Sequence, residues 1–131
     1  MQNDECKMQN ESCFAGNPAV DKSFDFAVRM INLYKYLTRK HREYVLSKQL
    51  LRCGTSIGAN IMEAQRGQSH ADFSAKMSIA LKEANEAYYW LKLLYRTDYL
   101  TDAQYASLNS DILELIGILT AICKTSQNRN M

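Results

Sequence analysis

The longest regular pattern in the sequence lies between residues 69 and 97. Small or apolar side chains recur there in an unbroken 4-3-4-3-4-3 spacing, at Phe73, Met77, Ala80, Ala84, Ala87, Leu91 and Leu94. This spacing places them on one face of an α-helix about 40 Å long. A single helix cannot bury such a stripe by itself. The pattern therefore predicts partner helices of similar length.

Three other segments carry stripes of the same kind. Residues 18 to about 38 present Phe26, Met30, Leu33 and Leu37, and the stripe is widened by Phe24, Val28 and Ile31. The segment before Gly67 has Leu46, Leu50, Cys53, Ile57, Ile61 and Ala64, and the one after Thr101 has Tyr105, Leu108, Ile112, Leu115, Leu119 and Ile122. Because the links between segments are short, the sequence predicts an all-α, antiparallel, up-down-up-down four-helix bundle.

Local signals place the ends of these helices. Pro18 suits the first turn of a helix, because the N–H that it lacks has no helical partner there. Ser69 with Asp72, and Thr101 with Gln104, have the spacing of capping boxes. We expect three regions: a flexible N-terminal tail at 1–17, the bundle at 18–125 and a frayed C-terminus at 126–131.

Composition narrows the class of protein. With 131 residues, one proline and five glycines, the chain has room for one helical domain. The polar, acidic start and the lack of a long apolar run predict a cytoplasmic protein that does not enter a membrane. The four cysteines form no C-x-x-C pair, so we expect reduced thiols, no metal site and no cofactor.

Charge is distributed unevenly along the chain. The net charge is only +2, but basic residues gather between positions 29 and 52. The candidates for contact with nucleic-acid phosphates are Arg29, Lys35, Arg39, Lys40, Arg42 and Lys48. An alternative is that this face meets the acidic fourth helix of a neighbouring copy in a ring.

Two further groups of side chains are interpreted as contacts between helices or subunits rather than as catalytic residues. A polar row on the second helix is predicted to fix helix register, with a ligand pocket or an exposed face as the alternatives, and consists of Arg52, Ser56, Asn60 and Glu63. The third helix carries an aromatic group, interpreted as an interface more than a base-stacking surface: Tyr88, Tyr89, Trp90 and Tyr95.

An enzymatic alternative rests on four carboxylates. Glu83 with Glu86 and Asp111 with Glu114 are spaced as in the Mg²⁺ sites of all-α nucleotide pyrophosphohydrolases. Such pairs are also common on solvated helices. His41 and His70 lack the setting of a catalytic base. We therefore expect a protein that is not an enzyme, with no catalytic residue, no metal ligand and no small-molecule substrate.

A family resemblance is carried by three stretches. These are Ser-Ile-Gly-Ala-Asn-Ile-Met-Glu-Ala at 56–64, Asp72-Phe73, and Ile79 to Glu83 followed by Glu86 to Leu91. Over residues 20 to 124 the chain resembles the bacterial four-helix-bundle family, also called the 23S rRNA intervening-sequence protein family. Many members carry glycine where this chain has Ala64, so we expect the second helix to extend there.

The resemblance implies an antiparallel bundle that assembles into a five-fold ring, with no established enzymatic activity. A related protein, the accessory variability determinant of diversity-generating retroelements, binds nucleic acid and a reverse transcriptase and is strongly basic. By this resemblance we expect a homopentamer that binds RNA or a nucleoprotein. The alternatives are a scaffold that binds only protein, and the Mg²⁺-dependent pyrophosphohydrolase.

Overall fold

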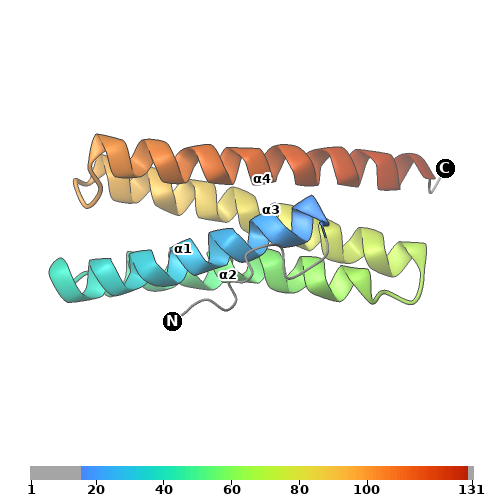
Figure 1. The fold of residues 1–131 in the computed structure, drawn as a ribbon, viewed down its shortest axis with the longest axis horizontal. Coiled ribbons are helices and arrows are strands. Elements are labelled where there is room, and N and C mark those ends of the chain that lie inside the picture. The colour runs from blue at the N-terminus through green and yellow to red at the C-terminus, as the bar shows by residue number, and fades with distance from the viewer. Residues whose placement is uncertain (1–15, 130–131) are drawn as a thin grey trace.

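The computed structural model describes residues 16–129 and contains four helices, with no strand in that range (Figure 1). They are α1 (Pro18–Lys40), α2 (Leu46–Gln65), α3 (His70–Arg96) and α4 (Asp102–Arg129). The all-α prediction is confirmed. Of the predicted tail at 1–17, residues 1–15 lie outside the described range.

The helices are antiparallel in chain order. Each packs on the next, α1 also packs on α4, and within the described residues the diagonal pairs have no Cα atoms within 8 Å of each other. The α1–α2 and α3–α4 turns therefore share one end of the bundle, whereas the α2–α3 turn lies at the other (Figure 1). This confirms the up-down-up-down topology.

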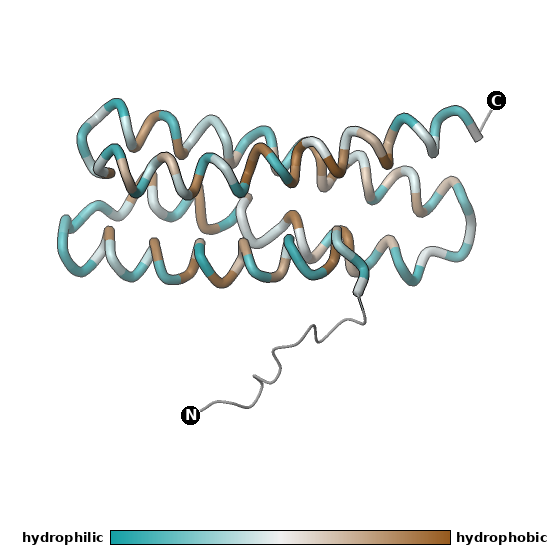
Figure 2. The backbone as a smooth tube through the Cα atoms, turned by 45° about the horizontal axis from the view of Figure 1, so that its top comes forward, coloured by the Kyte–Doolittle hydropathy of each residue, from teal (hydrophilic) through white to brown (hydrophobic). Residues whose placement is uncertain are grey.

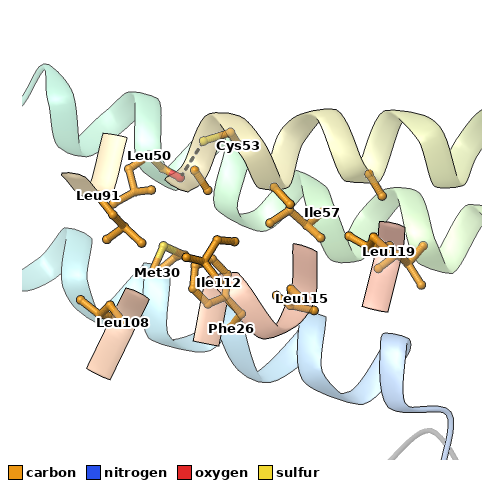
Figure 3. Packing of buried hydrophobic residues seen from close by; sticks show 14 of the residues in the cluster. Phe26, Met30, Leu50, Cys53, Ile57, Leu91, Leu108, Ile112, Leu115 and Leu119 are labelled. Carbon is orange, nitrogen blue, oxygen red and sulfur yellow. Dashed lines mark hydrogen bonds between the residues drawn. The ribbon is translucent and has the colours of Figure 1, made fainter. Parts of the chain in front are cut away.

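The centres of the predicted stripes form the core, whereas the three residues expected to widen the stripe of α1 are exposed: Phe24, Val28 and Ile31. Six of the seven stripe residues of α3 are buried, and only Phe73, next to the α2–α3 turn, is half-buried. Phe26 and Met30 of α1 meet Leu50 and Ile57 of α2 and the leucines of α4 in one cluster (Figure 3). Hydrophobic and hydrophilic segments alternate along all four helices (Figure 2). Burial of these stripes is the main force holding the bundle together.

Side chains cap the helices as the sequence indicates. The Asn17 side chain accepts from the N–H groups of Ala19 and Val20, ahead of Pro18. Ser69 Oγ accepts from Asp72 N at 3.0 Å. The box before α4 is reciprocal: Thr101 N donates to the Gln104 side chain, and Gln104 N donates to Thr101 Oγ1. Each cap satisfies N–H groups that the helix leaves unpaired.

Two glycines let α1 and α2 approach closely. A Cβ on Gly54 would lie 2.5 Å from Met30 Cγ, and one on Gly58 would lie 3.5 Å from the backbone oxygen of Ser23. This contact offsets the low helix propensity of glycine. Ala64 is buried and α2 continues to Gln65, as expected from the alanine.

Helix α4 extends through Arg129, beyond residue 125 where the sequence places the end of the bundle. Ser126 is buried, and its backbone oxygen lies 3.0 Å from His70 Nε2. This contact with the start of α3 keeps the last turns of α4 helical. By length and composition alone, α4 is also the one described helix that meets the criteria for a membrane span, with a mean hydropathy of 1.4. In the bundle, its apolar face packs in the core.

Candidate nucleic-acid interface

Five of the six basic candidates gather at one end of the bundle. Because α1 ends and α2 begins there, the fold places their side chains around a single turn, and all five are exposed: Lys35, Arg39, Lys40, Arg42 and Lys48. In the part of the chain that the structure describes, none of them forms an ion pair. Their charges are therefore available to an anionic partner.

Glu43 is the single acid of this basic stretch, and it faces inward. The residue is buried, and its carboxylate accepts from the N–H groups of Val45, Leu46 and Ser47 at 3.1, 2.9 and 2.7 Å. Burial alone raises the pKa of the Glu43 carboxyl, but these backbone hydrogen bonds outweigh it and the net pKa is lowered. The carboxylate neutralises the start of α2. The exposed surface of the turn thus carries no acid.

The turn itself is fixed by backbone bonds. The N–H groups of His41 and Glu43 both donate to the backbone oxygen of Leu37, at 3.2 and 3.1 Å. Between them Arg42 adopts a left-handed backbone with φ of 54°. With Glu43 held inside, its neighbours Arg42 and Tyr44 are both exposed.

An aromatic contact joins the two turns at this end. The His41 ring lies edge-on to Tyr36, with centroids 5.1 Å apart, and to Tyr99 in the α3–α4 connection at 5.8 Å. His41 Nε2 also lies 3.1 Å from the Tyr36 hydroxyl. The α1–α2 turn is therefore braced against the α3–α4 turn.

Arg96 extends the basic surface and was absent from the sequence candidates. It occupies the last turn of α3, is exposed, and has no ion-pair partner among the described residues. The sequence alone could not assign Arg96 to this basic surface, because Arg96 lies more than fifty residues from Arg42. Only the antiparallel topology identifies Arg96, because it puts the end of α3 at the same end of the bundle as the end of α1 and the start of α2. We call the set Lys35, Arg39, Lys40, Arg42, Lys48 and Arg96 the basic end.

Arg29 lies outside the basic end. Its guanidinium is 2.5 Å from Asp111 Oδ2, and it also donates to the Ser107 hydroxyl at 3.0 Å. These bonds cross the seam between α1 and α4. Because its charge is matched inside the chain, the structure does not group Arg29 with the phosphate-binding candidates.

The four carboxylates of the enzyme alternative lie at two different helix–helix interfaces, α2–α3 and α1–α4. Glu83 and Glu86 of α3 pair with Arg52 of α2 at 3.5 and 2.7 Å. Asp111 pairs with Arg29, and Glu114 with Lys22, across the α1–α4 seam. Each pair thus faces a cation rather than the other pair. In residues 16–129 no group of three or more His, Cys, Asp or Glu side chains is placed to hold a metal ion.

The polar row on α2 is divided among three local contacts. Arg52 binds the α3 carboxylates, Glu63 pairs with Lys76 of α3 at 2.6 Å, and Asn60 donates to Ser56 within α2. Three ion pairs therefore link α2 to α3. The Arg52 and Glu63 side chains are more than half exposed, so each pair contributes no more than about 1 kcal/mol. Hydrogen bonds from Trp90 and Arg52 lower the pKa of Glu86.

The aromatic group of α3 does not form one surface. Trp90 Nε1 donates to Glu86, and the Tyr95 ring stacks on Tyr105 with centroids 4.2 Å apart. The Tyr95 hydroxyl donates to Asp102 at 2.7 Å, which raises the pKa of Tyr95. Lys92 lies over the Tyr88 ring. Tyr89 alone of the four is classed as exposed, at 58%.

Two cysteines are described, Cys53 and Cys123, and both are buried free thiols. Burial raises the pKa of Cys53 to about 12. The thiolate is the reactive form, so Cys53 behaves as a core residue. In Figure 3 its S–H points to the backbone oxygen of Leu50.

Comparison with known proteins agrees with this architecture. A model of the 23S rRNA-intervening sequence proteins matches residues 17–121, which is most of the chain. The chain belongs to that family. The matched range covers α1 to α3, the basic end and most of α4.

A solved structure supports the same assignment. It is a protein of unknown function from the S23 ribosomal protein family of Bacteroides thetaiotaomicron, with 57% sequence identity and a TM-score of 0.80. The similarity covers 81% of this chain and 98% of the other. No curated protein matches the chain. Neither the family nor the solved relative indicates a catalytic class.

Proposed function

We propose that this protein is a non-enzymatic, cytoplasmic, oligomeric scaffold that binds RNA or a nucleoprotein through the basic end. The observation that carries the proposal is the sorting of charge at this end. Six cations point outward without ion-pair partners among the described residues, while Glu43 of the α1–α2 turn is buried. Two exposed acids, Asp98 and Asp102, lie at the neighbouring α3–α4 turn, and Asp102 accepts a hydrogen bond from Tyr95.

Elsewhere Lys22, Arg29, Arg52 and Lys76 are paired with acids. The other described cationic side chains without an ion pair are spread over the rest of the bundle: Arg66, Lys82, Lys92 and Lys124.

The physical basis is phosphate binding with release of counterions. Each phosphate that a Lys or Arg neutralises frees condensed cations, so affinity falls as salt rises. Contacts of this kind fix position without reading sequence. The small net charge of +2 is no obstacle, because six of the ten described cationic side chains without an ion pair lie at one end.

The experiment is neutralisation of the turn. We expect the triple variant Arg39→Gln, Lys40→Gln, Arg42→Gln to bind a structured RNA more weakly than the wild type. Its slope of log affinity against log salt should be smaller by about 2 to 3, which corresponds to the loss of three phosphate contacts. Fluorescence anisotropy between low and moderate salt measures both quantities.

The control removes three exposed cations elsewhere. Arg66→Gln, Lys82→Gln and Lys124→Gln change the net charge equally but lie away from the basic end. We expect them to keep most of the salt slope. Equal loss in both variants would mean that net charge alone matters. If the wild type shows no salt-dependent binding, the nucleic-acid proposal fails and a scaffold that binds only protein takes its place.

The second part of the proposal is self-association. A groove of about 290 Å³ runs between α1 and α2, lined by Phe24, Ala27, Ile31, Ala59 and Met62 among others. Phe24, Ile31 and Met62 remain 49%, 43% and 41% exposed, and Val28 beside them 45%. A contiguous apolar surface of this kind favours a protein partner. We propose a second copy of the chain as that partner, and five copies in a ring as the family resemblance implies.

A further inference from the structure

Tyr44 stands out at the basic end because it is large, aromatic and exposed. Its exposed fraction is 58%, and that of Val45 next to it is 71%. Within residues 16–129, the Tyr44 side chain has no hydrogen bond and no ring contact. Leaving an aromatic ring in water forgoes the stabilisation that its burial would give.

The position of Tyr44 is held by its neighbours. Glu43 is fixed by three hydrogen bonds to the N–H groups that follow it, and Ser47 Oγ donates to the Glu43 backbone oxygen at 2.8 Å. The residues on both sides of Glu43 are therefore presented outward in a defined arrangement. Arg42 lies on one side and Tyr44 on the other, with Lys48 one turn into α2.

We propose that Tyr44 is a stacking platform for an unpaired base, while Arg42 and the surrounding cations bind the flanking phosphates. The inference rests on the proposed function and names its ligand class: a single-stranded segment or loop of nucleic acid. Within a duplex each base face is covered by its neighbours, so an exposed aromatic ring has nothing to stack on except the outer faces of the two terminal base pairs. Exposed aromatics combined with cations are the means by which proteins bind single strands.

A second tyrosine provides a comparison within the same chain. Tyr89 is also 58% exposed, but it lies in the middle of α3, outside the basic end, and its ring already contacts Trp90 at 5.2 Å. Exposure alone therefore does not distinguish the two residues. Their surroundings do, because only Tyr44 adjoins Arg42 and the other free cations.

The test compares two RNA probes of equal nucleotide count, a hairpin with an unpaired loop and a blunt duplex. We expect the wild type to prefer the hairpin. Tyr44→Ala should lower hairpin affinity about tenfold or more, the loss expected for one stacked base, with duplex affinity unchanged. Tyr44→Phe keeps the ring and should keep the preference. Tyr89→Ala should behave as the wild type.

Several outcomes would overturn the inference. If Tyr44→Ala binds both probes as the wild type does, or weakens both equally, Tyr44 does not stack on a base, although salt-dependent binding stands. If Tyr44→Ala instead changes the sedimentation coefficient, Tyr44 is a contact between copies. If the wild type binds neither probe, the proposed function fails together with the inference. Circular dichroism of each variant confirms that the bundle is intact.

Discussion

Glu43 illustrates how a single residue sets the character of the basic end. Its carboxylate is the only acid between Arg29 and Arg52, and it caps α2 from three residues before the first residue of the helix. A carboxylate that accepts several backbone N–H bonds stabilises a helix start. The same side chain is thereby removed from the surface that a phosphate would approach.

We expect Glu43→Ala to lower the free energy of unfolding by about 1 to 2 kcal/mol at pH 7. The folded pKa of Glu43 is lowered, so its contribution is present above the unfolded value of about 4.3 and is lost as the pH falls through the folded value. The difference between variant and wild type should therefore shrink below about pH 4. Urea unfolding at pH 7 and pH 3 measures it.

The matched control is Asp25→Ala, which removes an exposed carboxylate from α1. We expect it to change stability by less than about 0.5 kcal/mol. An equal loss from Glu43→Ala at both pH values would show that the side chain acts through packing and not through its charge.

At the level of whole elements, the fit of α1 against α2 depends on two glycines. Gly54 faces Met30, which is 1% exposed and packed in the core. A methyl group at Gly54 meets the Cγ atom close to the Met30 backbone, so the side chain must be repacked. Gly117 on α4 differs, because nothing lies within 4 Å of a Cβ added there.

These surroundings predict opposite effects for the same substitution. Gly117→Ala should raise stability by about 0.5 to 1 kcal/mol through helix propensity. Gly54→Ala should lower it by about 1 to 3 kcal/mol, because overpacking outweighs the gain in propensity. Thermal unfolding of both variants tests this. Stabilisation by Gly54→Ala would mean that Met30 moves aside easily and that the close approach is unimportant.

For the whole molecule, the proposed self-association depends on the apolar groove between α1 and α2. We expect Ile31→Glu together with Met62→Glu to dissociate the assembly into monomers at micromolar concentration, because two buried charges would be unpaired at the interface. Sedimentation velocity measures the change. The control Gln68→Glu adds a charge in the exposed α2–α3 turn and should leave the assembly unaltered.

If the wild type is a monomer at that concentration, the proposed ring is ruled out. A double variant that stays assembled would place the interface on another face. The carboxylates of α4 are weak candidates for such a face, because Asp111 and Glu114 already pair with α1 of their own chain.

The sequence by itself determined the helices, their order and most of their ends. Apolar stripes repeat every three or four residues, and a cap such as Thr101 with Gln104 joins side chain and backbone within one turn. Because both signals lie within a few neighbouring residues, the local sequence is enough to predict the helices and their ends. The last turns of α4 were missed, because His70 is in contact with Ser126 across 56 positions.

The tertiary structure alone decided which charges are free. Arg29 and Arg39 are equivalent in the sequence, but Asp111, 82 positions away, binds the first and no described residue binds the second. The carboxylates of the enzyme alternative were separated in the same way, by Arg52 and Arg29 on different seams. Nothing in the local sequence shows that Glu43 is buried, which only its contacts with the N–H groups at the start of α2 establish. Ion pairing depends on distances of a few ångströms between distant segments, and those distances are set by helix packing rather than by local sequence.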